Sequence, residues 1–170
     1  MDKKDYIALS ERFRPNRFRL IFIAESPPVG DKYFYNPDGE ITEPLFAAMM
    51  KCVLDLKPED KLEGLQKFQE KGYYLLDATY TPVNKGFKRK KRNQIILNDY
   101  DSLKAELLRI DSNKSIPVIL IKKNICELLK PILRGDGFKV LNREEIIPFP
   151  SHGWQKVFCE RIKKILPRIN

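Results

Sequence analysis

Short apolar runs alternate along this chain with longer segments of helical periodicity. The runs at 20–24, 72–78 and 116–121 are typical of buried strands, because they are apolar and stop at charged residues, prolines or polar turns. Apolar residues repeat every three or four positions in the helical segments, at 45–56, 100–110, 124–133 and 154–165. This alternation predicts an α/β fold, a three-layer α/β/α sandwich with a mostly parallel central sheet.

Single residues refine the expected helices. Pro44 marks the start of the first helix, and Ser151 is the expected N-cap of the last one. Pro131 should break or redirect the third helix. Trp154 falls on the apolar face of the last helix, so it is expected in the core. The length of 170 residues suits one domain that spans residues 1–170.

Ligands of parallel sheets bind beyond the carboxyl ends of the strands. Three loops would meet at that edge: residues 25–41, residues 78–93, and residues 149–154 after a last short strand. The first of these loops begins with a carboxylate, prolines, a glycine and three consecutive aromatic residues. We therefore expect the functional site where these loops converge.

The charge of the chain is positive and unevenly distributed. It has 32 Lys and Arg against 23 Asp and Glu, a surplus of nine. Six positive charges fall in the loop "KGFKRKKR", at Lys85, Lys88, Arg89, Lys90, Lys91 and Arg92. Such a block attracts polyanions, and DNA is expected as a partner rather than RNA. The alternative is a solvated loop that only keeps the protein soluble.

The cysteines and the hydropathy indicate a compartment. Cys52, Cys126 and Cys159 lie far apart and form no CxxC pair, so neither a disulfide framework nor a zinc site is expected. No apolar stretch approaches the ~20 residues that a bilayer requires, and the first residues are too charged for a secretory signal. We expect a cytoplasmic monomer that makes no membrane contact.

The three loops resemble the motifs of the uracil-DNA glycosylase superfamily. The segments are "AESPPVGDKYFYN", "LLDATYTPVNK" and "FPSHGWQKVF", and the resemblance spans residues 19 to 166. It implies the fold of that superfamily and activity on a base flipped out of DNA. The first motif would hold the hydrolytic water and a stacking aromatic residue, the second would read the base edge, and the third would bind the base and the DNA backbone.

The chain departs from this pattern in three ways. Phe149 stands where the third motif usually has a histidine, and the single histidine of the chain, His152, comes just after it. Asp77 stands where the second motif usually has an asparagine. One branch of the superfamily binds an iron-sulfur cluster through four cysteines, and three scattered cysteines cannot build it. No cofactor or metal is expected.

Glu25 and the aromatic residues after it are the first candidates for the chemistry. Glu25 could hold the water and stabilise oxocarbenium-like positive charge; alternatively, it bonds backbone N–H groups of the next turn. Phe34 or Tyr35 could stack on the base; alternatively, both pack in the core.

Asp77, Ser151 and His152 are the remaining candidates. An ionised Asp77 only accepts hydrogen bonds, so it would favour a base edge with donors over uracil; alternatively, it braces the following loop. Ser151 could bind the base, and His152 could contact a phosphate or the leaving base. Their side chains point apart as sequence neighbours, so the two do not form a nucleophile and its base.

The sequence leaves three functions open. The first is a DNA-base N-glycosylase or a related nucleobase hydrolase of DNA repair. The second is a catalytically inactive nucleic-acid-binding module of the same fold, favoured by the missing histidine and by Asp77. The third is a protein that binds small nucleotides.

Overall fold

A small parallel sheet forms the centre of the computed structural model, which describes residues 1–167. Its strands are β1 (Leu20–Ala24), β2 (Tyr73–Asp77) and β3 (Val118–Leu120), in the order β2-β1-β3. Both neighbours run parallel to β1, so the carboxyl ends of all three strands meet at one edge. The parallel sheet and its three predicted strands are confirmed, with β3 shorter than expected.

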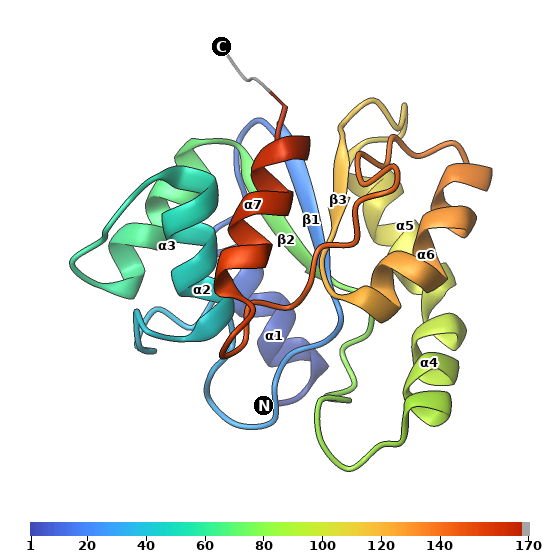
Figure 1. Cartoon of the computed structure of the whole chain (residues 1–170), viewed down its shortest axis with the longest axis horizontal. Helices are drawn as coiled ribbons and strands as arrows, with labels where there is room; N and C mark the ends of the chain where they lie inside the picture. The colour runs from blue at the N-terminus through green and yellow to red at the C-terminus, as the bar shows by residue number, and fades with distance from the viewer. Residues whose placement is uncertain (168–170) are drawn as a thin grey trace.

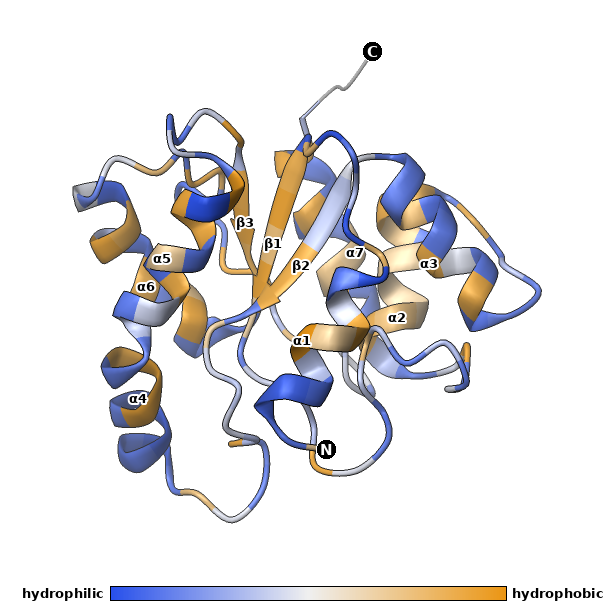
Figure 2. Ribbon diagram, turned by 180° about the vertical axis from the view of Figure 1, so that it is seen from behind, coloured by the Kyte–Doolittle hydropathy of each residue, from blue (hydrophilic) through white to orange (hydrophobic). Residues whose placement is uncertain are grey.

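Helices flank the strands on two sides (Figures 1 and 2). One group contains α1 (Lys3–Glu11), α2 (Pro44–Ala48), α3 (Lys61–Glu70) and α7 (Gln155–Ile165). The other contains α4 (Arg89–Asn98), α5 (Tyr100–Ile110) and α6 (Lys123–Gly135). Figure 2 shows apolar residues along the strands and polar residues on the outer turns of the helices. The protein is therefore mixed α/β.

Several predicted elements have different limits in the structure. The first predicted helix is split, because a π-helix, η1 (Met49–Leu54), follows α2 and ends at Asp55, whose φ is 52°. The helix α6 continues through Pro131 to Gly135, so the predicted break is wrong. The described residues after β3 contain no further strand, and only Val140 forms an isolated bridge, with Val118.

The beginning of the last helix also differs. The helix α7 starts at Gln155 with Trp154 at its N-cap position, so Ser151 is not the N-cap. Trp154 is 52% exposed, which contradicts its expected place in the core. The apolar stripe itself is confirmed farther along, because Phe158 and Ile162 are buried.

Two of the three cysteines are paired, against the prediction. Cys52 of η1 and Cys159 of α7 form a disulfide, with their Cα atoms 5.1 Å apart, and Cys126 is buried and unpaired. Cysteines 107 residues apart can be brought together only by the tertiary fold, which spacing in the sequence does not reveal. The cysteine argument for a reducing compartment no longer holds, and the cytoplasm stays a prediction.

None of the helices within residues 1–167 has the length and apolarity needed to cross a lipid bilayer.

Candidate active site

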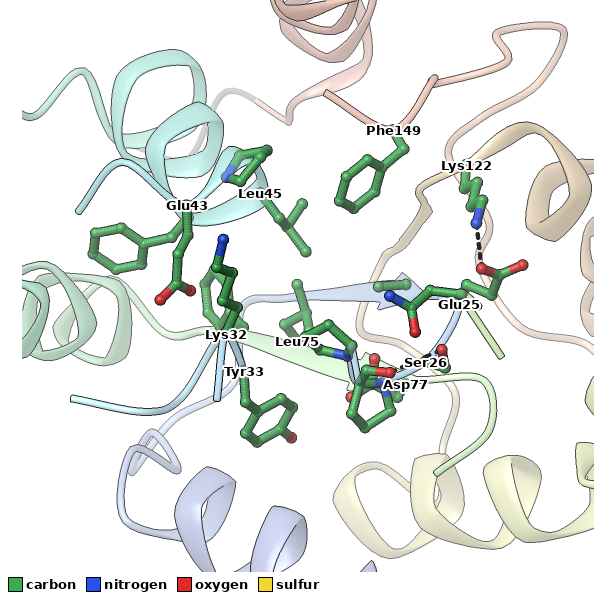
Figure 3. Close-up of a pocket in the computed structure, with 17 residues that line it drawn as sticks. Glu25, Ser26, Lys32, Tyr33, Glu43, Leu45, Leu75, Asp77, Lys122 and Phe149 are labelled. Carbon is green, nitrogen blue, oxygen red and sulfur yellow. Dashed lines mark hydrogen bonds and ion pairs between the residues drawn. The ribbon is translucent and has the colours of Figure 1, made fainter. Parts of the chain in front are cut away.

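A cavity of about 410 Å³ opens at the carboxyl edge of the sheet (Figure 3). Its walls come from the loop after β1, the start of α2, the end of β2 and the loop after it, the second residue after β3, and the segment before α7. The residues that line it include Glu25, Lys32, Tyr33, Phe34, Glu43, Asp77, Asn84, Lys122 and Phe149. Residues of all three loops that were expected to converge line this cavity, and the start of α2 and Lys122 join them.

Glu25 follows β1 directly and is 5% exposed. Its Oε1 accepts a hydrogen bond of 2.7 Å from the Asn124 side chain, and its Oε2 pairs with the Lys122 ammonium. The Nε of Arg92 lies 3.7 Å from Oε1. These partners are side chains from α4 and from the start of α6, so the alternative in which Glu25 bonds backbone N–H groups of the next turn is not observed.

Lys122 has a backbone conformation that a residue with a side chain rarely adopts. Its φ is 87° and its ψ is 137°, a region that favours glycine and that costs about 1–3 kcal/mol otherwise. The surrounding structure holds it there, because its N–H donates to Ile147 O (2.8 Å) and its C=O accepts from Cys126 N (3.0 Å). This conformation places the side chain of Lys122 in the cavity wall, next to Glu25.

The charges around Glu25 do not cancel. Two cations, Lys122 and Arg92, lie against one carboxylate, which leaves a net charge of +1 in the cluster (2 − 1). The exposed Lys32 adds a further positive charge at the cavity. An anionic group in the cavity would therefore be favoured.

Asp77, the last residue of β2, lies buried between this cavity and a second one of about 530 Å³ that contains Glu106. Burial, followed by the charge of Glu106, raises the pKa of Asp77 to about 8, while the Tyr33 hydroxyl opposes this shift. Within residues 1–167, its Oδ2 has no hydrogen-bond partner. This raised pKa favours the protonated carboxyl at neutral pH, whereas the preference for a base edge with donors was expected for the ionised form.

The structure distinguishes between the two aromatic candidates. Phe34 lines the cavity and packs edge-on against Tyr35, with ring centroids 5.0 Å apart. Tyr35 is fully buried in the core, where its hydroxyl accepts from Leu75 N (2.6 Å) and donates to Leu75 O (3.1 Å). Tyr35 therefore does not reach the cavity. Phe149 adds an aromatic ring from the opposite end of the chain to those of Tyr33, Phe34 and Phe46, and it is 36% exposed.

A buried ion pair fixes the loop that carries Phe34. The Nζ of Lys61, which is 1% exposed, donates to Glu43 Oε2 (2.6 Å) and to Tyr33 O (2.7 Å). Gly39 leaves room for this pair, because a Cβ there would lie 2.4 Å from Glu43 Oε1. Burial lowers the pKa of Lys61, while Glu43 opposes the shift.

The third motif contributes less than expected. Ser151 and His152 are exposed and do not line the cavity, whereas Phe149, which replaces the usual histidine, does. Phe149 therefore contributes an apolar wall but no hydrogen-bond donor. The described residues also hold no group of three or more His, Cys, Asp or Glu arranged to bind a metal ion.

The six basic residues are divided between a loop and a helix. Lys85 and Lys88 are exposed before α4, while Lys90 and Lys91 are exposed in its first turn. Arg89 pairs with Glu127 at 3.0 Å. Arg92 is only 23% exposed at its side chain and faces Glu25. The prediction of a loop through residue 93 is wrong, and Arg92 belongs to the site rather than to the surface.

Sequence reasoning missed Lys122 and Asn124. Both follow the predicted strand at 116–121, so the rule that sites form beyond strand ends could have indicated them. Neither residue lies in the three motifs that carry the resemblance. The positive φ of Lys122 has no signal in the sequence, because lysine is not a residue associated with that conformation.

Comparison of the chain with protein-family models, curated proteins and solved structures gives no match. The resemblance to the uracil-DNA glycosylase superfamily therefore depends on the three motifs.

Proposed function

We propose that the protein is a nucleobase N-glycosylase of the uracil-DNA glycosylase-like α/β/α fold, acting on DNA. The observation that carries the proposal is the convergence of Glu25, Asp77 and Lys122, each from the end of a different strand, on one cavity with aromatic walls. A volume of about 410 Å³ lies within the range of small-molecule sites.

Phe34, Phe149 and Asp77 supply the groups that would bind a base. Phe149, which is 36% exposed, offers apolar surface to its rings, and Phe34 adds a small area because it is only 5% exposed. A protonated Asp77 can donate one hydrogen bond and accept another, as an asparagine does. That pattern matches a base edge with one donor and one acceptor, such as those of uracil and hypoxanthine. Uracil is thus a substrate to test, contrary to the expectation from an ionised Asp77.

Glu25 supplies the charge that hydrolysis requires. Asn124 and Lys122 fix its two oxygens; Arg92 also faces Oε1, so Oε2 is the oxygen that keeps a second lone-pair direction for a water molecule. A carboxylate in this position would orient the water towards the sugar and stabilise the oxocarbenium-like centre.

The basic segment could guide DNA to the cavity. Asn84 lines the cavity, and its side chain accepts a hydrogen bond from Val29 N (3.0 Å). The exposed lysines at 85, 88, 90 and 91 follow within seven residues. Phosphates on either side of an extruded base would meet these charges.

The test is cleavage of duplex and single-stranded oligonucleotides that contain uracil, hypoxanthine, xanthine or alkylated bases. Alkaline treatment reveals the abasic sites. We expect Glu25→Gln to lower the single-turnover rate by about 10²-fold or more, while the Kd for DNA changes little. A variant that cleaves as fast as the parent protein would refute the mechanism.

The alternative function is a nucleic-acid-binding module without catalysis. The observation that favours it is the ion pairing of Glu25 with Lys122 and Arg92, together with the position of His152 outside the cavity. A parent protein that binds DNA in a salt-dependent manner and cleaves no member of the panel would support this alternative.

A further inference from the structure

We propose that Lys122 is a catalytic residue whose ammonium stabilises the negative charge on the departing base, an inference that rests on the proposed N-glycosylase function. It would supply the positive charge that neither Phe149 nor His152 provides in the cavity.

The position of Lys122 carries the proposal. Its side chain is 26% exposed and lines the cavity, on the opposite side of Glu25 from Asp77 in Figure 3. An ammonium has three N–H donors, so pairing with Glu25 leaves two for a ligand. Arg92 also faces Glu25, and the cluster retains a positive charge even with the carboxylate ionised.

The backbone of Lys122 supports a functional role. A glycine would adopt φ 87° without strain, yet the chain has a lysine there and holds it with two backbone hydrogen bonds. Strain of this kind is retained mainly where the side chain must occupy one place. Here that place adjoins both Glu25 and the cavity.

The negative charge on the base develops when the glycosidic bond breaks. The bond between C1′ of the sugar and the base nitrogen breaks, and both bonding electrons leave with the base. The water oxygen bonds to C1′, and one water proton passes to the Glu25 carboxylate. The base is an anion until it receives that proton, and the Lys122 ammonium stabilises this anion.

The first experiment compares two leaving groups in the same oligonucleotide, uracil and 5-fluorouracil, whose anion is the more stable. Lys122→Met keeps the chain length and removes the charge. We expect its single-turnover rate to fall about 10²-fold on uracil and distinctly less on 5-fluorouracil. Equal losses on both bases, as Glu25→Gln should give, would show that Lys122 acts only by holding Glu25 and would overturn the proposal.

Lys123→Met is the matched control. Lys123 is the adjacent lysine, its side chain is 66% exposed, and it contacts Glu127 on the surface of α6 at 3.8 Å. Both variants lose one positive charge at the same end of α6. We expect the control to cleave both bases at the parent rate, and a loss equal to that of Lys122→Met would overturn the proposal.

A second experiment does not require turnover. Free 5-fluorouracil is titrated into the Asp77→Asn variant at one pH below and one pH above the pKa of the base. Asparagine carries no charge at either pH, so residue 77 stays neutral in both titrations. We expect tighter binding of the anion, and we expect Lys122→Met to abolish that gain. If the parent protein cleaves nothing but the Asp77→Asn protein shows this gain, the glycosylase proposal fails while the anion site at Lys122 stands. Absence of the gain would overturn the anion site.

Discussion

The carboxyl of Asp77 keeps its proton at neutral pH because burial raises its pKa to about 8. A base that pairs with the protonated carboxyl should lose affinity as the pH rises through about 8, because the ionised form only accepts hydrogen bonds. Asp77→Asn keeps the donor and the acceptor at every pH. We expect the binding of free uracil to weaken with rising pH in the parent protein and to stay level in Asp77→Asn, measured by calorimetric titration.

The same group links pH to stability. The pKa of Asp77 is about 8 when folded and near 3.8 when unfolded, so the folded state binds the proton more tightly. This contribution is fully present below pH 3.8 and is lost as the pH rises through about 8. The unfolding free energy of the parent protein should fall relative to Asp77→Asn by a few kcal/mol between about pH 4 and 9, measured with denaturant. Parallel pH profiles would contradict the raised pKa.

The sequence predicted the positions of some single residues correctly and of others incorrectly. Glu25, Phe34 and Asp77 line the cavity as expected, because each belongs to a strand end or to the loop that follows it. Tyr35 packs in the core, which was the alternative to stacking, and the core position expected for Trp154 is wrong. Whether a residue in an irregular segment points inward depends on tertiary contacts. The raised pKa of Asp77 comes first from burial and then from the charge of Glu106, which is 29 residues away in the sequence, and no local pattern indicates either cause.

Among the helices and strands, α4 has an N-terminus whose residues do not stabilise a helix. Its N-cap residue is Lys88, which makes no capping hydrogen bond, and the first turn holds no acidic residue. Cations here oppose the helix dipole. Replacing Lys88, Lys90 and Lys91 with serine should flatten the slope of log K for DNA against log salt by about 2–3 units. Stability should be unchanged or higher by about 0.5–1 kcal/mol, because serine is a good N-cap.

The control for the triple serine variant of α4 replaces Lys57, Lys67 and Lys71 with serine in the same way. These exposed lysines lie in or beside α3, which belongs to the other group of helices. The change in net charge is the same. If the two triple variants show equal salt slopes in fluorescence anisotropy titrations, α4 does not bind the DNA backbone.

The Lys61–Glu43 pair connects α3 to the loop that carries the aromatic residues. Lys61→Met should destabilise the protein by about 3–5 kcal/mol, because it leaves the Glu43 carboxylate buried without its cation. Lys61→Met combined with Glu43→Gln should recover part of that loss, because no buried charge remains. Urea unfolding measures both variants, and a double variant less stable than the single one would contradict this explanation.

Periodicity predicted some elements better than others. The strands and α5 were predicted because their apolar residues are continuous or evenly spaced. The first turn of α4 was taken for a loop because charged residues show no apolar face, and only Ile96 of this helix is buried. The helix α6 passes through Pro131, because tertiary packing of its buried face compensates for one lost hydrogen bond.

For the whole molecule, the Cys52–Cys159 disulfide joins η1 to α7 across 107 residues of sequence. A crosslink that closes a loop of this length can stabilise a fold by about 4 kcal/mol in the chain-entropy description. Cys52→Ser with Cys159→Ser should lower the unfolding free energy by up to that amount. The parent protein should lose the same amount in a thiol reductant, and the double variant should not respond to the reductant.

The alternation of strands and helices was sufficient to predict a parallel sheet, and a cavity does lie at its carboxyl edge. It was not sufficient to predict which side chains fill that edge. The positions of Lys122 and Arg92 depend on how α4 and α6 lie against the sheet, which is set by long-range packing rather than by the sequence within each element.

The hydroxyl of Tyr35 completes the hydrogen bonding of a buried edge strand. The strand β2 lies at the end of the strand order, and the N–H and C=O of Leu75 bond to this one phenolic oxygen. All five residues of β2 and the Tyr35 side chain are buried, so water cannot replace the hydroxyl. A single side-chain oxygen therefore occupies the place of a neighbouring strand, and Tyr35→Phe should leave two backbone groups buried without a partner, a loss of about 1–3 kcal/mol that should appear as faster deuterium exchange of the Leu75 amide.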